Sequence, residues 1–227
     1  NEWWGEGFTE WTNVKRGHPF YRGHYQPREP LNGNYYDFSC GWGVRLLGAL
    51  VHNMNYFGTD PNYLLTERLE QLSTDYKSVV RNNSSVDIRT QGSQYFIPEW
   101  ENKIGLAFSS PPYFYLEDYR IGDQSYKDGT SYDSWKSNYL KPTFENISKY
   151  LIDSGYFLLN INNFDKFNLV EDSISIAENI GFHLVGFHTL SNIKRCNTKG
   201  TFNDNEEKIL VFNKNKEKKI RESNKLF

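Results

Sequence analysis

The sequence predicts an α/β protein with a mostly parallel seven-stranded sheet and a C-terminal antiparallel hairpin. From residue 35 onward, short apolar runs typical of buried strands alternate with longer segments whose apolar residues recur at helical spacing. The last two strand-like runs follow each other without a helix, which favours an antiparallel pair at one sheet edge. The 227 residues are enough for one domain with a proper core.

The predicted strands are short and end at turn-forming residues. They cover residues 35–38, 55–60, 86–90, 104–108, 155–161, 181–190 and 206–212.

The predicted helices lie between these strands, over residues 43–54, 63–80, 135–151 and 169–180. In the first, one face is expected to carry Val44, Leu47, Leu50 and Val51. The second has a longer apolar stripe, formed by Leu65, Leu69, Leu72, Tyr76 and Val79. Pro142 is expected to kink the third helix, because proline lacks the N–H that a helix interior needs.

Composition narrows the function classes. The formal net charge is −2, which argues against nucleic-acid binding by the whole surface. Neither a membrane-spanning stretch nor a signal-peptide pattern is found. The two cysteines, Cys40 and Cys196, have no metal-ligand spacing, and the five histidines form no cluster. We therefore expect a reduced, cytoplasmic protein without a metal. The sequence does not predict its oligomeric state.

A nucleotide-cofactor arrangement follows the first strand. The strand ends at Asp37, a turn contains Gly41 and Gly43, and the next strand ends at the acidic Asp60. Glycines let a cofactor approach the backbone, and the acidic residue accepts hydrogen bonds from ribose hydroxyls. Leu46 stands where a dinucleotide fingerprint has its third glycine, which disfavours nicotinamide binding. S-adenosylmethionine, a common cofactor without a pyrophosphate, fits better.

A second signal is the stretch FSSPPYF, which directly follows the fourth predicted strand. Pro111 and Pro112 cannot donate to a sheet ladder, so they end the strand. The residue before a proline is held extended, which makes Ser110 part of a stiff, open loop. Open α/β sheets bind ligands at this edge, although a turn with a surface tyrosine would explain the stretch as well.

Taken in order, DFSCGWGVRLLGAL, GTDPN, QGS and AFSSPPYFYLEDY resemble the motifs of amino-group DNA methyltransferases. The resemblance covers about residues 34–213 and implies the class I S-adenosylmethionine-dependent methyltransferase fold, which is Rossmann-like. It also implies a cofactor site formed by Asp37, Phe38, Ser39, Gly41, Gly43, Asp60, Pro61, Gly92 and Ser93. The implied catalytic residues are Ser110, Pro111, Pro112 and Tyr113.

The chemistry of this family explains the loop. An exocyclic amino nitrogen is a poor nucleophile because its lone pair is delocalised into the base. Ser110 Oγ and the Pro111 carbonyl could accept both amino hydrogens and favour a pyramidal nitrogen, while Tyr113 stacks on the flipped base. No strong base or metal is needed. Within the family, serine before Pro-Pro-Tyr leans toward cytosine N4 over adenine N6. The implied partner is DNA, with RNA as the alternative.

The sequence departs from the family at several points. Phe38 replaces a common proline, and Gly105 stands where an aspartate is common. The loop over residues 117–133 is the only candidate for reading DNA sequence, so specificity is expected to be slight or to come from a partner.

The first thirty residues, NEWWGEGFTEWTNVKRGHPFYRGHYQPREP, are instead similar to the start of WbsX-like glycosyltransferases. The likeness covers a small part of such a domain, so Glu2, Glu6 and Glu10 are not carried over as catalytic. We expect an irregular fragment over residues 1–33, the methyltransferase domain over 34–213 and a basic tail over 214–227.

Three other functions stay open at this point. An RNA or other amino-group methyltransferase would share every motif. A non-catalytic methyltransferase remnant, fused to a glycosyltransferase fragment, would keep the fold without the activity. A glycan-processing protein would follow from the opening segment alone.

Overall fold

The computed structural model describes residues 32–114, 124–126, 130–163, 165–190 and 207–214. The N-terminal glycosyltransferase-like segment up to residue 31, most of the candidate DNA-reading loop and the basic tail from residue 215 lie outside the described residues.

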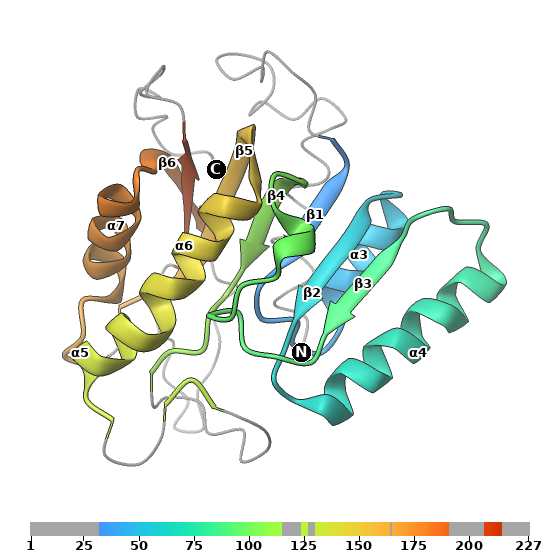
Figure 1. Cartoon of the computed structure of the whole chain (residues 1–227), viewed down its shortest axis with the longest axis horizontal. Helices are drawn as coiled ribbons and strands as arrows, with labels where there is room; N and C mark the ends of the chain where they lie inside the picture. The colour runs from blue at the N-terminus through green and yellow to red at the C-terminus, as the bar shows by residue number, and fades with distance from the viewer. Residues whose placement is uncertain (1–31, 115–123, 127–129, 164, 191–206, 215–227) are drawn as a thin grey trace, which may run out of the picture.

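One seven-stranded sheet runs through the molecule (Figure 1). Its strands are β1 (Asn34–Asp37), β2 (Asn55–Thr59), β3 (Val86–Arg89), β4 (Ile104–Ser109), β5 (Leu151–Ile161), β6 (His183–Leu190) and β7 (Glu207–Asn213). The order is β3-β2-β1-β4-β5-β7-β6. The first five strands are parallel, and β7 is antiparallel to both β5 and β6. The mostly parallel sheet with an antiparallel pair at one edge, as predicted from the alternating pattern, is confirmed.

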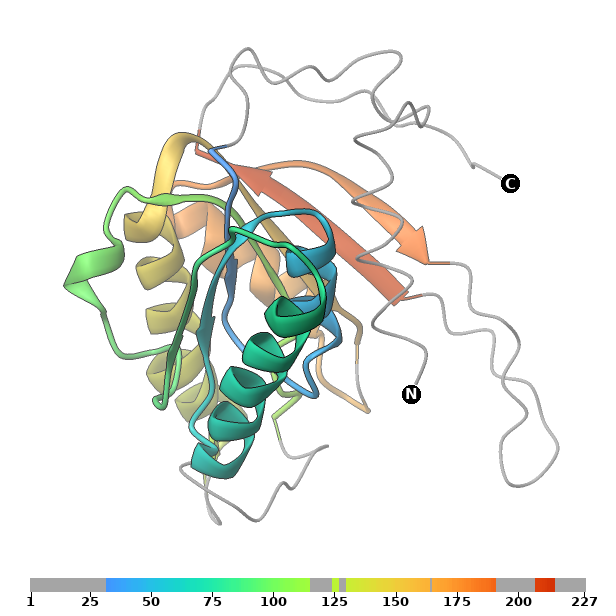
Figure 2. The same ribbon diagram turned by 90° about the vertical axis from the view of Figure 1, so that its right-hand side faces the viewer.

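Helices cover both faces of this sheet (Figure 2). One face carries α3 (Val44–Val51) and α4 (Tyr63–Val79). The other carries α6 (Lys141–Tyr150) and α7 (Leu169–Ile180), with the short α5 (Tyr132–Trp135) before them. A 3-10 turn, η2 (Pro98–Trp100), precedes β4.

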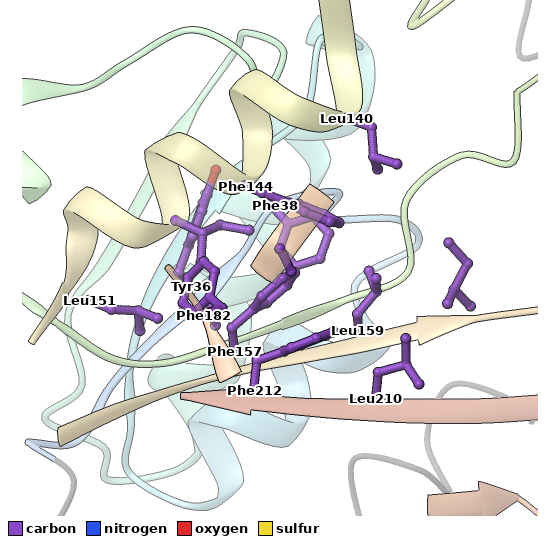
Figure 3. Packing of buried hydrophobic residues seen from close by; sticks show 14 of the residues in the cluster. Tyr36, Phe38, Leu140, Phe144, Leu151, Phe157, Leu159, Phe182, Leu210 and Phe212 are labelled. Carbon is purple, nitrogen blue, oxygen red and sulfur yellow. The ribbon is translucent and has the colours of Figure 1, made fainter. Parts of the chain in front are cut away.

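The core under α6 and α7 is built largely from aromatic rings, as Figure 3 shows. The Phe157 ring of β5 lies 4.9 Å from Phe144 of α6 and 5.3 Å from both Phe182 and Phe212, measured between ring centroids. Such pairs stabilise a core by about 0.5–1.5 kcal/mol each beyond the area that they bury. This rigid layer supports β4 and β5 from one side.

The buried face of α3 differs from the apolar face predicted for it. Arg45, Leu46, Ala49 and Leu50 are the buried residues, whereas Val51 is 58% exposed. Leu50 is buried as predicted and Val44 and Leu47 are partly buried, but the prediction was wrong for Val51 and missed Arg45. It used apolar spacing alone, whereas an arginine with a buried acidic partner can take a core position.

The third predicted helix is interrupted by a π-helical turn, η3 (Lys136–Leu140), between α5 and α6. Pro142 lies in the first turn of α6, directly after it. A proline inside a helix clashes with the carbonyl four residues earlier, and the wider turn is where this helix departs from α geometry. Both Tyr139 and Leu140, neighbours in the turn, are buried.

Strand β5 begins four residues earlier than predicted, directly after α6. Its pairing with β4 shifts between Ile104 and Leu106, whose partners are Leu151 and Tyr156. Such an irregularity marks a bulge. A prediction based on regular strand spacing therefore missed residues 151–154, the first part of β5.

Candidate active site

The site lies at the carboxyl ends of the central parallel strands. The chain goes from β1 to β2 on one side and returns to β4 on the other side of β1. The loops after β1 and β4 therefore diverge, which leaves a crevice at the point where open α/β sheets bind ligands. One cavity of about 990 Å³ occupies this position, and it is lined by residues from the loops after β1, β2, β3 and β4.

The turn after β1 depends on two glycines in left-handed conformation. Gly41 has φ +57° and Gly43 has φ +89°. A Cβ atom on Gly43 would lie 2.8 Å from a methyl carbon of Leu69 and 2.9 Å from one of Leu72, both on α4. Gly41 lines the cavity, whereas Gly43 lies behind it as the N-cap of α3. These glycines let the turn fold tightly against α4.

A buried ion pair between Asp37 and Arg45 also holds this turn in place. Asp37 is fully buried, and its Oδ2 accepts hydrogen bonds from Arg45 Nε at 2.8 Å and from the Tyr56 hydroxyl at 3.0 Å. The Arg45 guanidinium also donates to the carbonyl of Ser39. Burial alone would lower the pKa of Arg45, but the Asp37 carboxylate raises it overall. Asp37 is absent from the cavity lining and acts here as a positioning residue for the turn.

Asp60 and Pro61 line the cavity directly after β2. Burial raises the pKa of Asp60 to about 6, although the backbone N–H groups of Asn62 and Gly41 stabilise its charged form. Asp60 Oδ1 accepts from Asn62 N at 3.0 Å. Asn62 in turn caps α4, accepting from the backbone of Leu64 and Leu65. The carboxylate is thus held at the cavity edge, and its pKa of about 6 leaves it ionised at neutral pH.

The turn after β3 brings Gly92 and Ser93 to the cavity. The Ser93 hydroxyl lies 2.9 Å from that of Thr143 on α6, so this side chain is engaged with the protein. Beside it, Gln94 also lines the cavity, and its buried Oε1 finds no donor among the described residues. A buried acceptor without a donor is unfavourable, so the position suits a ligand N–H or O–H.

The Pro-Pro loop forms the opposite wall. Ser110 and Pro112 line the cavity, Pro111 is buried, and Tyr113 is half-buried against the aromatic core rather than part of the lining. Ser109 Oγ donates to the Ser39 carbonyl at 3.2 Å, which ties this loop to the glycine turn.

The loop is anchored at its far end by Phe114. This residue has φ +43° and is buried among the rings of Tyr126, Tyr132, Trp135 and Phe167, at centroid distances of 5.5–6.0 Å. Positive φ is unfavourable for a phenylalanine, and the surrounding rings hold it there. The Pro-Pro loop is therefore preorganised between two fixed points.

Several residues of the site were missed by the sequence prediction. Arg68 and the 82% exposed Trp42 line the cavity on the α4 side, and Gln124, Ser125 and Tyr139 line it beyond the Pro-Pro loop. The Tyr139 hydroxyl lies 3.5 Å from Ser39 Oγ. The sequence feature that could have pointed to Tyr139 is Pro142. A proline inside a predicted helix marks an irregular turn, and Tyr139 lies in that turn.

Within the described residues, no helix is long and apolar enough to span a membrane. In that same part of the chain, no group of three or more histidine, cysteine or acidic side chains is arranged to hold a metal ion.

The fold is that of the class I S-adenosylmethionine-dependent methyltransferases. Magnesium protoporphyrin IX methyltransferase from Synechocystis PCC 6803 is 10% identical with a TM-score of 0.54, over 93% of this chain and 78% of that chain. A methyltransferase from Clostridium acetobutylicum ATCC 824 is 12% identical with a TM-score of 0.54, over 92% and 90%. The [4+2]-cyclase SpnF shares the fold at 11% identity and a TM-score of 0.54, over 80% and 74%, so the fold alone does not fix the reaction.

Within this class the chain belongs to the N6/N4 DNA methylase family. The sequence model of that family matches residues 104–226, just over half of the chain. The match begins at the first residue of β4 and includes the positions of the Pro-Pro loop.

The N-terminal likeness is also found. The model of the glycosyltransferase WbsX family matches residues 1–44. The uncharacterised protein WxcX of Xanthomonas campestris pv. campestris is 57% identical over 35 residues, which is 15% of this chain and 5% of that relative. The WbsX match extends beyond the thirty residues that carried the resemblance, and it overlaps β1 and the glycine turn.

Proposed function

We propose that this protein transfers the methyl group of S-adenosylmethionine to the exocyclic amino group of a base in DNA, with cytosine N4 favoured over adenine N6. The observation that carries the proposal is a single cavity that is bounded on one side by Asp60 and the glycine turn, and on the other by Ser110 and Pro112. The methyl donor, bound at the first wall, and the amino group that accepts the methyl, bound at the second, would face each other across this cavity. Membership of the DNA methylase family supports DNA as the substrate.

The residues present fit S-adenosylmethionine. The Asp60 carboxylate can accept both ribose hydroxyls, and the left-handed turn at Gly41 leaves the backbone open to close approach. The buried Oε1 of Gln94 needs a donor, which an amino group of the cofactor offers. When bound, the cofactor supplies an electrophilic methyl group on a sulfonium. Asp37 takes part indirectly, by fixing the turn through Arg45.

On the substrate side, Ser110 Oγ and the Pro111 carbonyl accept hydrogen bonds from the two N–H groups of the target amino group. This draws the nitrogen toward pyramidal geometry and directs its lone pair across the cavity. Methyl transfer would form the N–C bond as the C–S bond of the cofactor breaks, and one of the two amino protons would then be released to water. We assign stacking on the extruded base to Tyr113, whose half-buried ring packs against the aromatic core in this structure and would have to turn toward the cavity to reach a base. The link from Ser109 to Ser39 keeps the two walls at a fixed separation.

The direct test is transfer of labelled methyl to unmodified DNA, with the product bases separated by mass spectrometry. Ser110→Ala should lower the turnover number by about 10²–10³-fold, the loss typical for one preorganised polar contact to a reacting centre. Cofactor affinity, measured by calorimetry, should stay within twofold. Ser78→Ala is the matched control, because that exposed hydroxyl donates to a carbonyl of α4 away from the cavity.

Three outcomes separate the alternatives. If the wild-type protein binds the cofactor and methylates RNA but not DNA, RNA takes the place of DNA as the proposed substrate. Wild-type protein that does not bind the cofactor would identify a non-catalytic remnant. Full activity in Ser110→Ala would remove the loop from the mechanism. A cytoplasmic location, where DNA and reduced cysteines coexist, belongs to the same proposal.

A further inference from the structure

The order of the loops around the cavity determines how an extended cofactor can lie in it. The strands β3, β2, β1 and β4 are neighbours in the sheet, and residues after each of them line the cavity. Gln94 follows β3, Asp60 follows β2, and the glycine turn follows β1. Neighbouring strands are about 4.8 Å apart, so the loop after β3 and the glycine turn lie about 10 Å apart. An extended ligand therefore meets these loops one after another.

S-adenosylmethionine has three parts that match this order. Its adenine carries an amino group, which suits the buried Gln94 Oε1 that finds no donor among the described residues. Its ribose hydroxyls suit the Asp60 carboxylate. The remaining part, an amino-acid chain with a carboxylate, then belongs at the glycine turn. A cation at this part of the cavity is needed to pair with that carboxylate.

Arg68 of α4 is a cation that is free to take this role. In the described part of the chain, the ionised side chains that line the cavity are Asp60, Arg45 and Arg68. Arg45 is already paired with Asp37. Arg68 is exposed and makes no hydrogen bond or ion pair with the described residues. Its guanidinium therefore has all of its donors available for a ligand.

The packing of α4 places Arg68 beside the glycine turn. A Cβ atom on Gly43 would lie 2.8 Å from Leu69 and 2.9 Å from Leu72. Arg68 precedes Leu69 and lies one helical turn before Leu72. Trp42, the residue before Gly43, lines the cavity with its side chain 82% exposed, and no ring of the described residues contacts it. One cationic and one aromatic side chain thus line the same part of the cavity.

We propose that the amino-acid end of the cofactor lies between Arg68, which binds its carboxylate, and Trp42, which packs over its sulfonium. A guanidinium can donate two parallel hydrogen bonds to a carboxylate. The face of an indole attracts a nearby cation, so Trp42 contributes more to S-adenosylmethionine than to the neutral thioether of S-adenosylhomocysteine. This inference concerns the cofactor alone and does not depend on which substrate accepts the methyl group.

Two ligands that differ only in the amino-acid part test the role of Arg68. S-adenosylhomocysteine and 5′-methylthioadenosine share the adenosine and the thioether, but only the first has a carboxylate. Arg68→Gln removes the charge and keeps a flexible polar side chain. Measured by calorimetry, it should raise the Kd of S-adenosylhomocysteine about tenfold, the loss for one charge-assisted contact at a partly open site. The Kd of 5′-methylthioadenosine should stay within twofold of wild type.

Arg81→Gln is the matched control, because Arg81 is an exposed arginine just beyond the end of α4 and does not line the cavity. It should leave both Kd values unchanged. Trp42→Leu tests the other contact in the same titrations. It should reduce the preference of the protein for S-adenosylmethionine over S-adenosylhomocysteine by about two- to fivefold, the range for an exposed cation–π contact.

Several results would overturn the assignment. If Arg68→Gln weakens both adenosine ligands equally, Arg68 acts on the adenosine part or on folding and does not bind the carboxylate. Unchanged Kd values in Arg68→Gln would likewise refute its role, and an unchanged preference in Trp42→Leu would refute that of Trp42. A wild type that binds neither ligand would refute the cofactor site as a whole. The expected pattern of Kd values supports the assignment even where DNA is not methylated, because no methyl acceptor is present in these titrations.

Discussion

Replacing Asp60 by asparagine should stabilise the cofactor-free protein and weaken its binding of cofactor. Folding raises the pKa of this carboxyl from 3.8 to about 6, chiefly through burial. Between these values the folded state binds more protons than the unfolded state, so this group's contribution to stability is full below pH 4 and falls as the pH rises through 6. At neutral pH the ionised carboxylate therefore lowers stability.

The size of each effect follows from the structure. Two pKa units correspond to about 3 kcal/mol, and partial exposure of Asp60 to solvent reduces this to about 1–2 kcal/mol. Asparagine keeps the shape and cannot ionise, so Asp60→Asn should gain that amount at pH 7.5. The lost charge-assisted bonds to ribose hydroxyls should weaken cofactor binding by about 1.5–3 kcal/mol.

The assay combines urea unfolding and calorimetry from pH 4.5 to 8. Cofactor Kd of the wild type should rise about tenfold per pH unit below pH 6, as the carboxyl takes up its proton, whereas the variant should show a nearly flat profile. A variant with wild-type Kd at pH 7.5, or a wild type whose Kd does not change through pH 6, would refute the role given to Asp60. A less stable variant would refute the assignment of the raised pKa to burial.

Two more substitutions test the turn itself. Arg45→Met leaves the buried Asp37 carboxylate without its ion pair and should reduce the free energy of unfolding by about 3–5 kcal/mol. The double variant Arg45→Met/Asp37→Asn should regain much of that loss, because no unpaired charge is then buried. Equal stability of the single and the double variant would contradict this account. In a urea titration, Gly43→Ala should destabilise the protein by about 1–3 kcal/mol more than Gly181→Ala does. Both glycines have positive φ, but a Cβ on Gly43 also meets α4, whereas a Cβ on Gly181 meets nothing within 4 Å. Equal losses in the two variants would rule out the steric contribution.

The strands and helices could be predicted from sequence wherever one simple rule decided the structure. The helix over residues 169–180 was predicted with its observed bounds, because its apolar spacing is regular and Gly181, in left-handed conformation, ends it. The loop after β4 was likewise predicted from the missing N–H groups of two prolines. Local chemistry of this kind needs no knowledge of distant residues.

The parts that sequence analysis missed depend on contacts between distant residues. The buried face of α3 is set by the pairing of Arg45 with Asp37, which apolar spacing cannot reveal. Asp37 was predicted as a cofactor ligand. In the structure its carboxylate accepts hydrogen bonds from Arg45 and Tyr56, which the residue type alone does not indicate. Gln94, Gln124 and Tyr139 reach the cavity from a turn, a loop and a π-helical turn, and no spacing rule connects them.

The position of β1 limits how this protein can be shortened. β1 is hydrogen-bonded to β2 on one side and to β4 on the other, yet it lies within the residues that match the glycosyltransferase family. Its Tyr35 hydroxyl donates to the Phe108 carbonyl at 2.8 Å, and the Tyr36 hydroxyl lies 3.0 Å from that of Thr59. A chain trimmed at the end of the glycosyltransferase match would lose the strand that joins the two halves of the sheet. The end of the glycosyltransferase match therefore falls inside a single folding unit, and a shortened protein that keeps the sheet intact has to begin at or before residue 34.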